Sequence, residues 1–148
     1  MKRINKYKKL FSVDEDTNLK TLKKTYRNLV KEWHPDKFQN QEEKDEADIM
    51  STQIIDGYHF LVSIAPETIS ANFDVYTETI TNSGIADYIH KGLLLEITFL
   101  DGTTYEYFGV TKQIYIKMIN SSKLNRFAKR TIYPNYIYRK SKRTAQEV

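Results

Sequence analysis

The sequence predicts an α+β protein, with an N-terminal antiparallel helical hairpin followed by a small β-meander that carries one helix. Apolar residues recur at helical spacing over residues 18–33 and 42–63, and they switch to alternation on both sides of Asp101-Gly102. The switch in period predicts two units of different secondary structure. The expected division is a helical domain over residues 1–64, a linker over 65–83, a β-rich domain over 84–140 and a basic tail over 141–148.

Charge is unevenly distributed along the 148 residues. The net charge is +6 over residues 1–38, −11 over residues 39–108 and +9 over residues 109–148, which together give the net charge of +4. Two basic ends around an acidic middle indicate separate units with separate electrostatic roles. The same pattern is also typical of a solubilising surface.

The composition argues against several classes of protein. Cysteine is absent, so the chain forms no disulfide, and a location in the reducing cytoplasm is expected. No stretch approaches the run of about 18 apolar residues that a membrane span requires. The first residues lack the apolar core of a secretory signal. We therefore expect no contact with a membrane.

Residues 18–33 have the pattern of an amphipathic helix. Asp16 or Thr17 is expected to cap its start, and Pro35 to end it, because proline disfavours helical geometry in the preceding residue. Its apolar stripe is Leu19, Leu22, Tyr26, Leu29, Val30 and Trp33. Another stripe is basic and consists of Lys20, Lys23, Lys24, Arg27 and Lys31. Five cations on one stripe indicate an acidic partner, although a solvated basic face has the same pattern.

A second helix is predicted over residues 42–63. Its first turns are acidic, which suits the positive end of the helix dipole. The two helices are expected to pack antiparallel through Leu22, Tyr26, Leu29, Met50, Ile54 and Tyr58. An apolar lead-in that includes Tyr7 and Phe11 can close one end of this domain.

The loop between the helices contains His34-Pro35-Asp36. Pro35 stiffens the chain, so the imidazole and the carboxylate are presented in a fixed relation, although Asp36 also suits a turn residue that bonds its own backbone. A metal site needs two further donors, and no cysteine or histidine cluster is nearby. No serine or cysteine nucleophile accompanies the pair either. We therefore expect binding and not catalysis, with no metal and no cofactor.

The segments KKTYRNLVKEWHPDKF and QIIDGYHFL resemble helix II, the HPD loop and helix III of a J-domain. The resemblance covers residues 5–64 and departs from the family at Phe38 and Gln39, where many members have Asn. It implies a co-chaperone that stimulates the ATPase of a DnaK-type heat-shock-70 chaperone and is itself no enzyme. The contact residues that it implies are His34, Pro35 and Asp36, supported by Tyr26, Arg27, Lys23 and Lys31.

The second half is predicted to be β-rich. Residues 65–84 have the composition of a linker in which Phe73, Val75 and Ile80 can form one exposed strand. Alternating runs around Asp101-Gly102 predict a hairpin. A helix is expected over residues 111–121, capped by Thr111 and with Ile114, Met118 and Ile119 inward. The last strand is expected over residues 132–138, at a sheet edge because of Pro134.

The segment LEITFLDGTTYEYFGV and the helix after it resemble the KTSC domain, over residues 84–138. Thr111 stands where the family has Pro, and Leu124 where it has Gly. In a simple J-protein with such a module, the remainder of the chain is expected to bind a client or partner. The family also occurs beside a lysyl-tRNA synthetase, which implies contact with nucleic acid.

Basic residues and aromatic rings are interleaved over residues 109–148. This pattern is typical of proteins that hold single-stranded nucleic acid by phosphate attraction and ring stacking. The candidate residues are Lys123, Arg126, Lys129 and Arg130. The alternative function is therefore an RNA-binding protein. A purely structural interpretation, in which the tyrosines form the core and the cations a solvated rim, is somewhat favoured.

Overall fold

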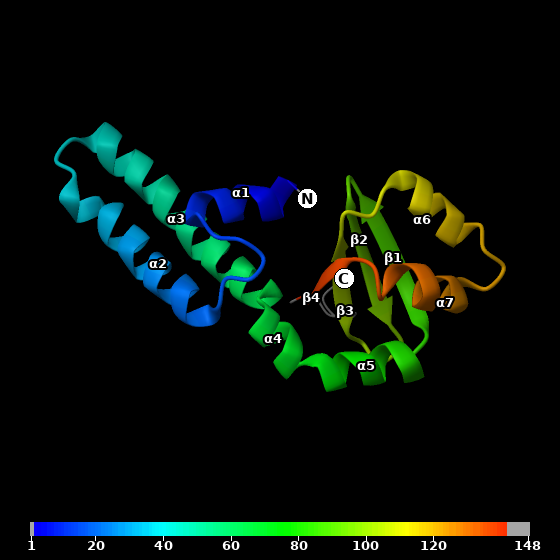
Figure 1. The fold of residues 1–148 in the computed structure, drawn as a ribbon. Coiled ribbons are helices and arrows are strands. Elements are labelled where there is room, and N and C mark those ends of the chain that lie inside the picture. The colour runs from blue at the N-terminus through cyan, green and yellow to red at the C-terminus, as the bar shows by residue number, and fades with distance from the viewer. Residues whose placement is uncertain (1, 142–148) are drawn as a thin grey trace. The chain divides into compact units, whose positions relative to one another are not determined.

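The structure, a computed structural model, describes residues 2–141. These residues form two compact units that divide between Ser70 and Ala71, and the elements of both are drawn in Figure 1. Within this range, no helix is both long enough and apolar enough to cross a membrane. Apart from Ser141, the expected basic tail lies outside the described residues.

The first unit consists of helices. They are α1 (Lys2–Phe11), α2 (Leu19–Glu32), the 3-10 turn η1 (Pro35–Lys37), α3 (Gln41–Ile64) and α4 (Pro66–Ala71). The predicted helices over 18–33 and 42–63 are confirmed as α2 and α3. They pack on each other with Leu22 and Ile54 buried and with the rings of Tyr26 and Tyr58 stacked 4.2 Å apart. The expected apolar lead-in is a full helix, α1.

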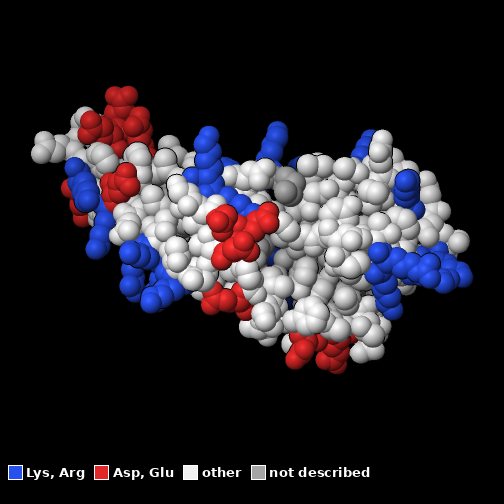
Figure 2. All heavy atoms as spheres, viewed as in Figure 1, with Lys and Arg blue, Asp and Glu red and all other residues white. Residues whose placement is uncertain are grey.

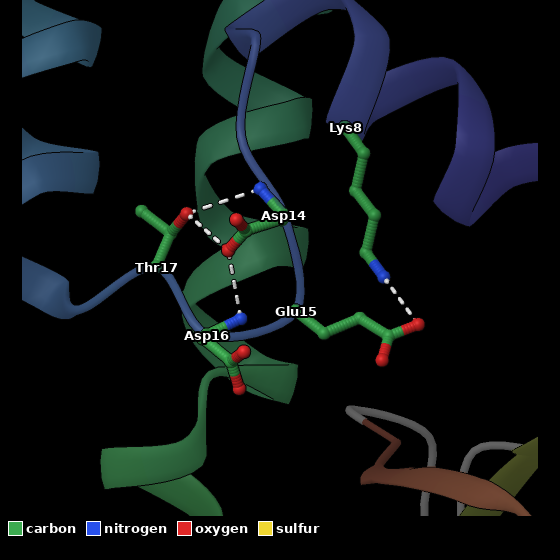
Figure 3. A network of polar contacts seen from close by, with 5 residues as sticks. All are labelled: Lys8, Asp14, Glu15, Asp16 and Thr17. Carbon is green, nitrogen blue, oxygen red and sulfur yellow. Dashed lines mark hydrogen bonds and ion pairs between the residues drawn. The ribbon is translucent and has the colours of Figure 1, made fainter.

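The start of α2 is built differently from the prediction. Asn18 is its N-cap, and the side-chain Oδ1 of Asn18 accepts the N–H of Thr21 at 2.8 Å. Asp14 and Thr17 instead bond to each other at 3.1 Å in the loop before the helix, as Figure 3 shows. Glu67 of α4 adds a second acceptor, because its carboxylate takes the N–H of Leu19 at 2.7 Å. The expectation that Asp16 or Thr17 caps this helix was wrong, since both belong to the preceding turn.

Helix α1 packs closely on α3 at a glycine. Ile4, Tyr7 and Phe11 are buried, and a Cβ atom at Gly57 would meet Cδ1 of Tyr7 at 2.8 Å. That separation is too short for two carbon atoms in contact. Gly57 therefore sets the distance between the two helices.

The second unit is a four-stranded antiparallel sheet with helices. The sheet order is β1 (Ile85–Lys91), β2 (Leu94–Phe99), β3 (Thr104–Phe108) and β4 (Ile137–Lys140). The helical elements are α5 (Phe73–Asn82), α6 (Lys112–Ile119), α7 (Leu124–Phe127) and the π-helical turn η2 (Ala128–Ile132). The α+β class is confirmed, and the predicted hairpin is β2–β3, closed by the Phe99 and Thr103 backbones at 2.8 Å.

Residues 66–82 are helical and contain no strand, so the exposed strand expected around Phe73, Val75 and Ile80 was wrong. The reason is that α5 carries core side chains. Tyr76 is buried, and its hydroxyl bonds the hydroxyl of Tyr107 at 3.0 Å. Its ring also stacks on Tyr138 with centroids 3.8 Å apart. Helix α5 therefore belongs to the second unit, and it does not form an irregular linker.

The turn between β2 and β3 is held by a carboxylate. Asp101 accepts the N–H of Thr103 at 2.9 Å and the hydroxyl of Thr79 at 3.0 Å. Burial by itself would raise the pKa of Asp101, but the hydrogen bonds from Thr103 and Thr79 outweigh it and lower the pKa. The turn thus ties the hairpin to α5.

The segment after the hairpin was only partly predicted. Thr111 caps α6 as expected, by accepting the N–H of Ile114 at 3.3 Å, and Met118 is buried. Ile119 is 40% exposed, so its predicted inward position was wrong. The last strand begins at Ile137 and not at residue 132, because Ala128 and Ile132 are buried by helical geometry.

Candidate functional site

Helix α2 presents its basic side chains on one exposed face. Lys20, Lys23, Lys24, Arg27, Asn28 and Lys31 line a shallow hollow of about 330 Å³ along the helix. In Figure 2 basic atoms gather over α2, and acidic atoms gather at the start of α3. No described carboxylate forms an ion pair with these five cations. The face is therefore suited to an acidic partner.

The loop after α2 exposes His34 and Asp36. The side chains are 51% and 91% exposed, respectively. The N–H of Asp36 donates to Nδ1 of His34 at 3.2 Å. A hydrogen bond of this kind needs an unprotonated Nδ1, so in the neutral ring the proton lies on Nε2. Nδ1 of His34 also lies 3.5 Å from the Asp36 carboxylate. The loop thus offers a partner one donor, Nε2–H, and one acceptor, the carboxylate.

The ends of this loop are fixed by packing. The rings of Trp33 and Phe38 stack with centroids 6.2 Å apart. Ser51 of α3 donates its hydroxyl to the carbonyl of Trp33 at 3.2 Å, and Phe38 N–H donates to the carbonyl of Pro35 at 3.1 Å. Phe38, the departure from the family pattern, therefore closes the turn from one side.

The structure brings most of the predicted J-domain contact residues together. His34, Pro35 and Asp36 follow directly after α2, and Lys23, Arg27 and Lys31 are exposed on it. Tyr26 differs from these, because it is only half-exposed and stacks on Tyr58. Its position indicates a packing role beneath the basic face.

The candidate nucleic-acid residues divide into two groups. Lys123, Arg126 and Arg130 line one hollow of about 310 Å³, which we name the α7 hollow and whose walls also include Ser121, Ser122 and Phe127. Lys129 does not line it, because its Nζ reaches the carbonyl of Thr81 at 3.3 Å. In Figure 2 basic side chains concentrate over α7. Sequence reasoning did not include the two serines, although they directly precede Lys123.

The tyrosines near this hollow belong to the core. Tyr133 is 6% exposed, and burial raises its pKa well above the usual value. Tyr138 stacks on Tyr76, and Tyr136 packs against the same cluster. Tyr133 is therefore a core residue, and Tyr136 and Tyr138 are half-buried against the same core. Among residues 2–141, no group of three or more potential metal ligands is present.

Two family models match the chain. The DnaJ domain matches residues 6–64, and the KTSC domain matches residues 81–136. None of the curated proteins compared with the chain matches it. The chain thus carries a DnaJ domain followed by a KTSC domain, as the sequence resemblance implied. A DnaJ domain supports a co-chaperone role and partnership with Hsp70-type chaperones in general.

Proposed function

We propose that this protein stimulates the ATPase of a DnaK-type chaperone through the His34–Asp36 loop and the basic face of α2. The observation that carries the proposal is the exposed pair of His34 and Asp36, which projects one donor and one acceptor beside five unpaired cations. A partner surface with acidic groups around a polar pocket would complement it.

The mechanism is differential binding. The loop and the α2 face bind the chaperone conformer that hydrolyses ATP more tightly than the other conformer, so they shift the population toward hydrolysis. The catalytic groups then belong to the chaperone, and this chain contributes contacts only. The KTSC domain recruits a client or partner, and the absence of cysteine suits work in the reducing cytoplasm.

The test is single-turnover ATP hydrolysis by a DnaK-type chaperone, measured against the concentration of this protein. His34→Gln and Asp36→Asn should each abolish stimulation, because each removes one exposed group without changing the core. Circular dichroism checks that the variants are folded. Gln39→Ala, at an exposed position just beyond the loop, is the matched control. A folded His34→Gln variant that stimulates like the unchanged protein would refute the proposal.

A further inference from the structure

The α7 hollow concentrates positive charge without a compensating acid. Lys123, Arg126 and Arg130 line it, and none of them forms an ion pair with a carboxylate of residues 2–141. Three like charges that line one hollow repel each other. A bound anion would relieve this repulsion.

The hollow also contains hydroxyl groups that suit an oxyanion. Ser121 and Ser122 lie in its wall, directly before Lys123. Oγ of Ser121 accepts the N–H of Lys123 at 3.2 Å, which fixes the backbone at the rim. Phosphate oxygens are acceptors only, and they are bound by guanidinium forks, ammonium groups and hydroxyls together. This is the donor set that the hollow presents.

The basic face of α7 and η2 is held by a buried opposite face. Ala128 and Ile132 are 0% exposed, and Oδ1 of Asn125 accepts the N–H of Ile85 in β1 at 2.9 Å. The helix continues as a π turn, in which Tyr133 N–H donates to the carbonyl of Ala128 at 3.0 Å. π turns are rare and occur frequently at functional sites. This one contains Arg130.

We propose that the α7 hollow binds the phosphate group of a nucleotide, either free or as one unit of a single strand. Its volume of about 310 Å³ lies at the lower end of the range for small-molecule sites, about 300–1,000 Å³, and suits one nucleotide. The half-buried ring of Phe127 supplies one apolar contact. No tyrosine of residues 2–141 lines the hollow, so recognition is centred on phosphate.

The test compares two variants that lose the same charge. The first is Lys123→Gln/Arg126→Gln/Arg130→Gln in the hollow, and the second is Lys91→Gln/Lys112→Gln/Lys117→Gln at exposed positions elsewhere in the same unit. Calorimetry measures binding of uridine 5′-monophosphate, inorganic phosphate and uridine at low salt. Fluorescence anisotropy measures binding of an oligouridine of about ten nucleotides, a length within the usual single-strand footprint.

The hollow variant should bind the monophosphate or the oligouridine at least about tenfold more weakly, since it loses every charged donor of the site. The control variant should stay within about twofold of the unchanged protein, because its three lysines do not line the hollow. For the oligouridine, the slope of log K against log salt should fall by about 0.7 for each phosphate no longer neutralised. If the protein binds the oligouridine but not the monophosphate, the hollow recognises a phosphate within a strand. If it binds both ligands, the hollow is a site for a free nucleotide.

Three results would overturn the proposal: uridine binding as tightly as its monophosphate, equal losses in both variants, or no binding of any phosphate ligand. If circular dichroism shows the hollow variant unfolded, Arg126→Gln and Arg130→Gln are tested singly. Stimulation of the chaperone ATPase should be unchanged in the hollow variant. The proposal for this site and the proposal for the His34–Asp36 loop can therefore be refuted independently.

Discussion

The indole of Trp33 and the ring of Phe38 stack with centroids 6.2 Å apart, one on each side of the His34–Asp36 turn. Trp33 ends α2, and Phe38 follows η1, so the stack joins the two ends of the exposed loop. Of the four residues between them, His34, Asp36 and Lys37 are exposed and only Pro35 is half-buried. The geometry of the loop therefore depends on an aromatic contact that lies outside the HPD tripeptide.

Phe38→Ala should raise the concentration needed for half-maximal stimulation of the chaperone by about three- to tenfold, without abolishing stimulation. The loop loses its stack but keeps His34 and Asp36, so the population of the binding conformation falls and the apparent affinity falls with it. Titration of single-turnover hydrolysis should show a higher half-maximal concentration and a similar plateau. Phe38→Leu, which keeps apolar volume, should recover part of the loss. An unchanged half-maximal concentration would mean that the stack does not shape the loop.

Charge reversal on α2 should act mainly on the association rate. Lys23→Glu/Arg27→Glu should slow binding to the chaperone by about tenfold or more at low ionic strength, because complementary charge steers encounter. The difference should shrink as salt screens the charges. Stopped-flow binding at two salt concentrations measures it. The control is Lys2→Glu/Lys9→Glu on exposed positions of α1; an equal effect of this pair would remove the special role of the α2 face.

Gly57→Ala should destabilise the first unit although alanine usually favours a helix by about 1 kcal/mol over glycine. The new Cβ would lie 2.8 Å from Cδ1 of Tyr7, and overpacking of this kind costs about 1–3 kcal/mol. Denaturant unfolding followed by circular dichroism measures the change. Asp56→Ala, at an exposed position of the same helix, should be neutral or slightly stabilising. A stabilised Gly57→Ala variant would show that α1 can move away without penalty.

Glu106 and Arg139 form a buried pair across β3 and β4, with Nε and the carboxylate 3.0 Å apart and side chains 7% and 13% exposed. Removing one partner of a buried ion pair typically costs about 3–5 kcal/mol. Glu106→Leu should therefore lower the free energy of unfolding by about that amount. Glu106→Leu/Arg139→Met should be less destabilised than the single variant. If the double variant loses as much free energy of unfolding as the two single changes together, the two residues are not a coupled pair.

The stability of the hairpin turn should depend on pH through Asp101. The folded state lowers its pKa from the ordinary 3.8, so its carboxylate contributes stability above that value and loses it as pH falls through the lower folded pKa. Asp101→Asn should therefore have a lower free energy of unfolding than the unchanged protein at neutral pH. The difference between the two should shrink in acid. Unfolding in urea at pH 7 and near pH 3 measures this, and a constant difference would point to lost packing instead.

The helical half was the more predictable one from sequence, because its signals are local. The apolar spacing defined α2 and α3 to within one residue at each end, and the resemblance around His34 named the exposed loop. The cap could not be assigned, since Asp14, Asp16, Thr17 and Asn18 all offer suitable oxygens and only the turn geometry selects Asn18. The role of Phe38 could not be predicted from the sequence either, because its stack on Trp33 is a tertiary contact.

In the second half, the hairpin and the cap at Thr111 follow from short-range chemistry and were predictable. The composition of residues 65–83, rich in polar residues, suggested a linker because helical propensity there is weak. Burial of Tyr76 against Tyr107 and Tyr138 overrides that propensity. Likewise, the α7 hollow includes Arg130 and Thr131 of a π turn, and no spacing rule in the sequence indicates such a turn.

Helix α5 lies mostly before the KTSC match, but the sheet domain needs it to fold. The KTSC match begins at residue 81, but Tyr76 supplies a ring and a hydroxyl to the centre of the sheet domain. A fragment cut at the family boundary would expose the faces of Tyr107 and Tyr138 to water and leave a hole where Tyr76 had been. One cut at Asn72 would retain them. Recombination between the two modules should therefore be tolerated before α5 and should be destabilising within it. The N-terminal boundary of the sheet domain is thus the start of α5.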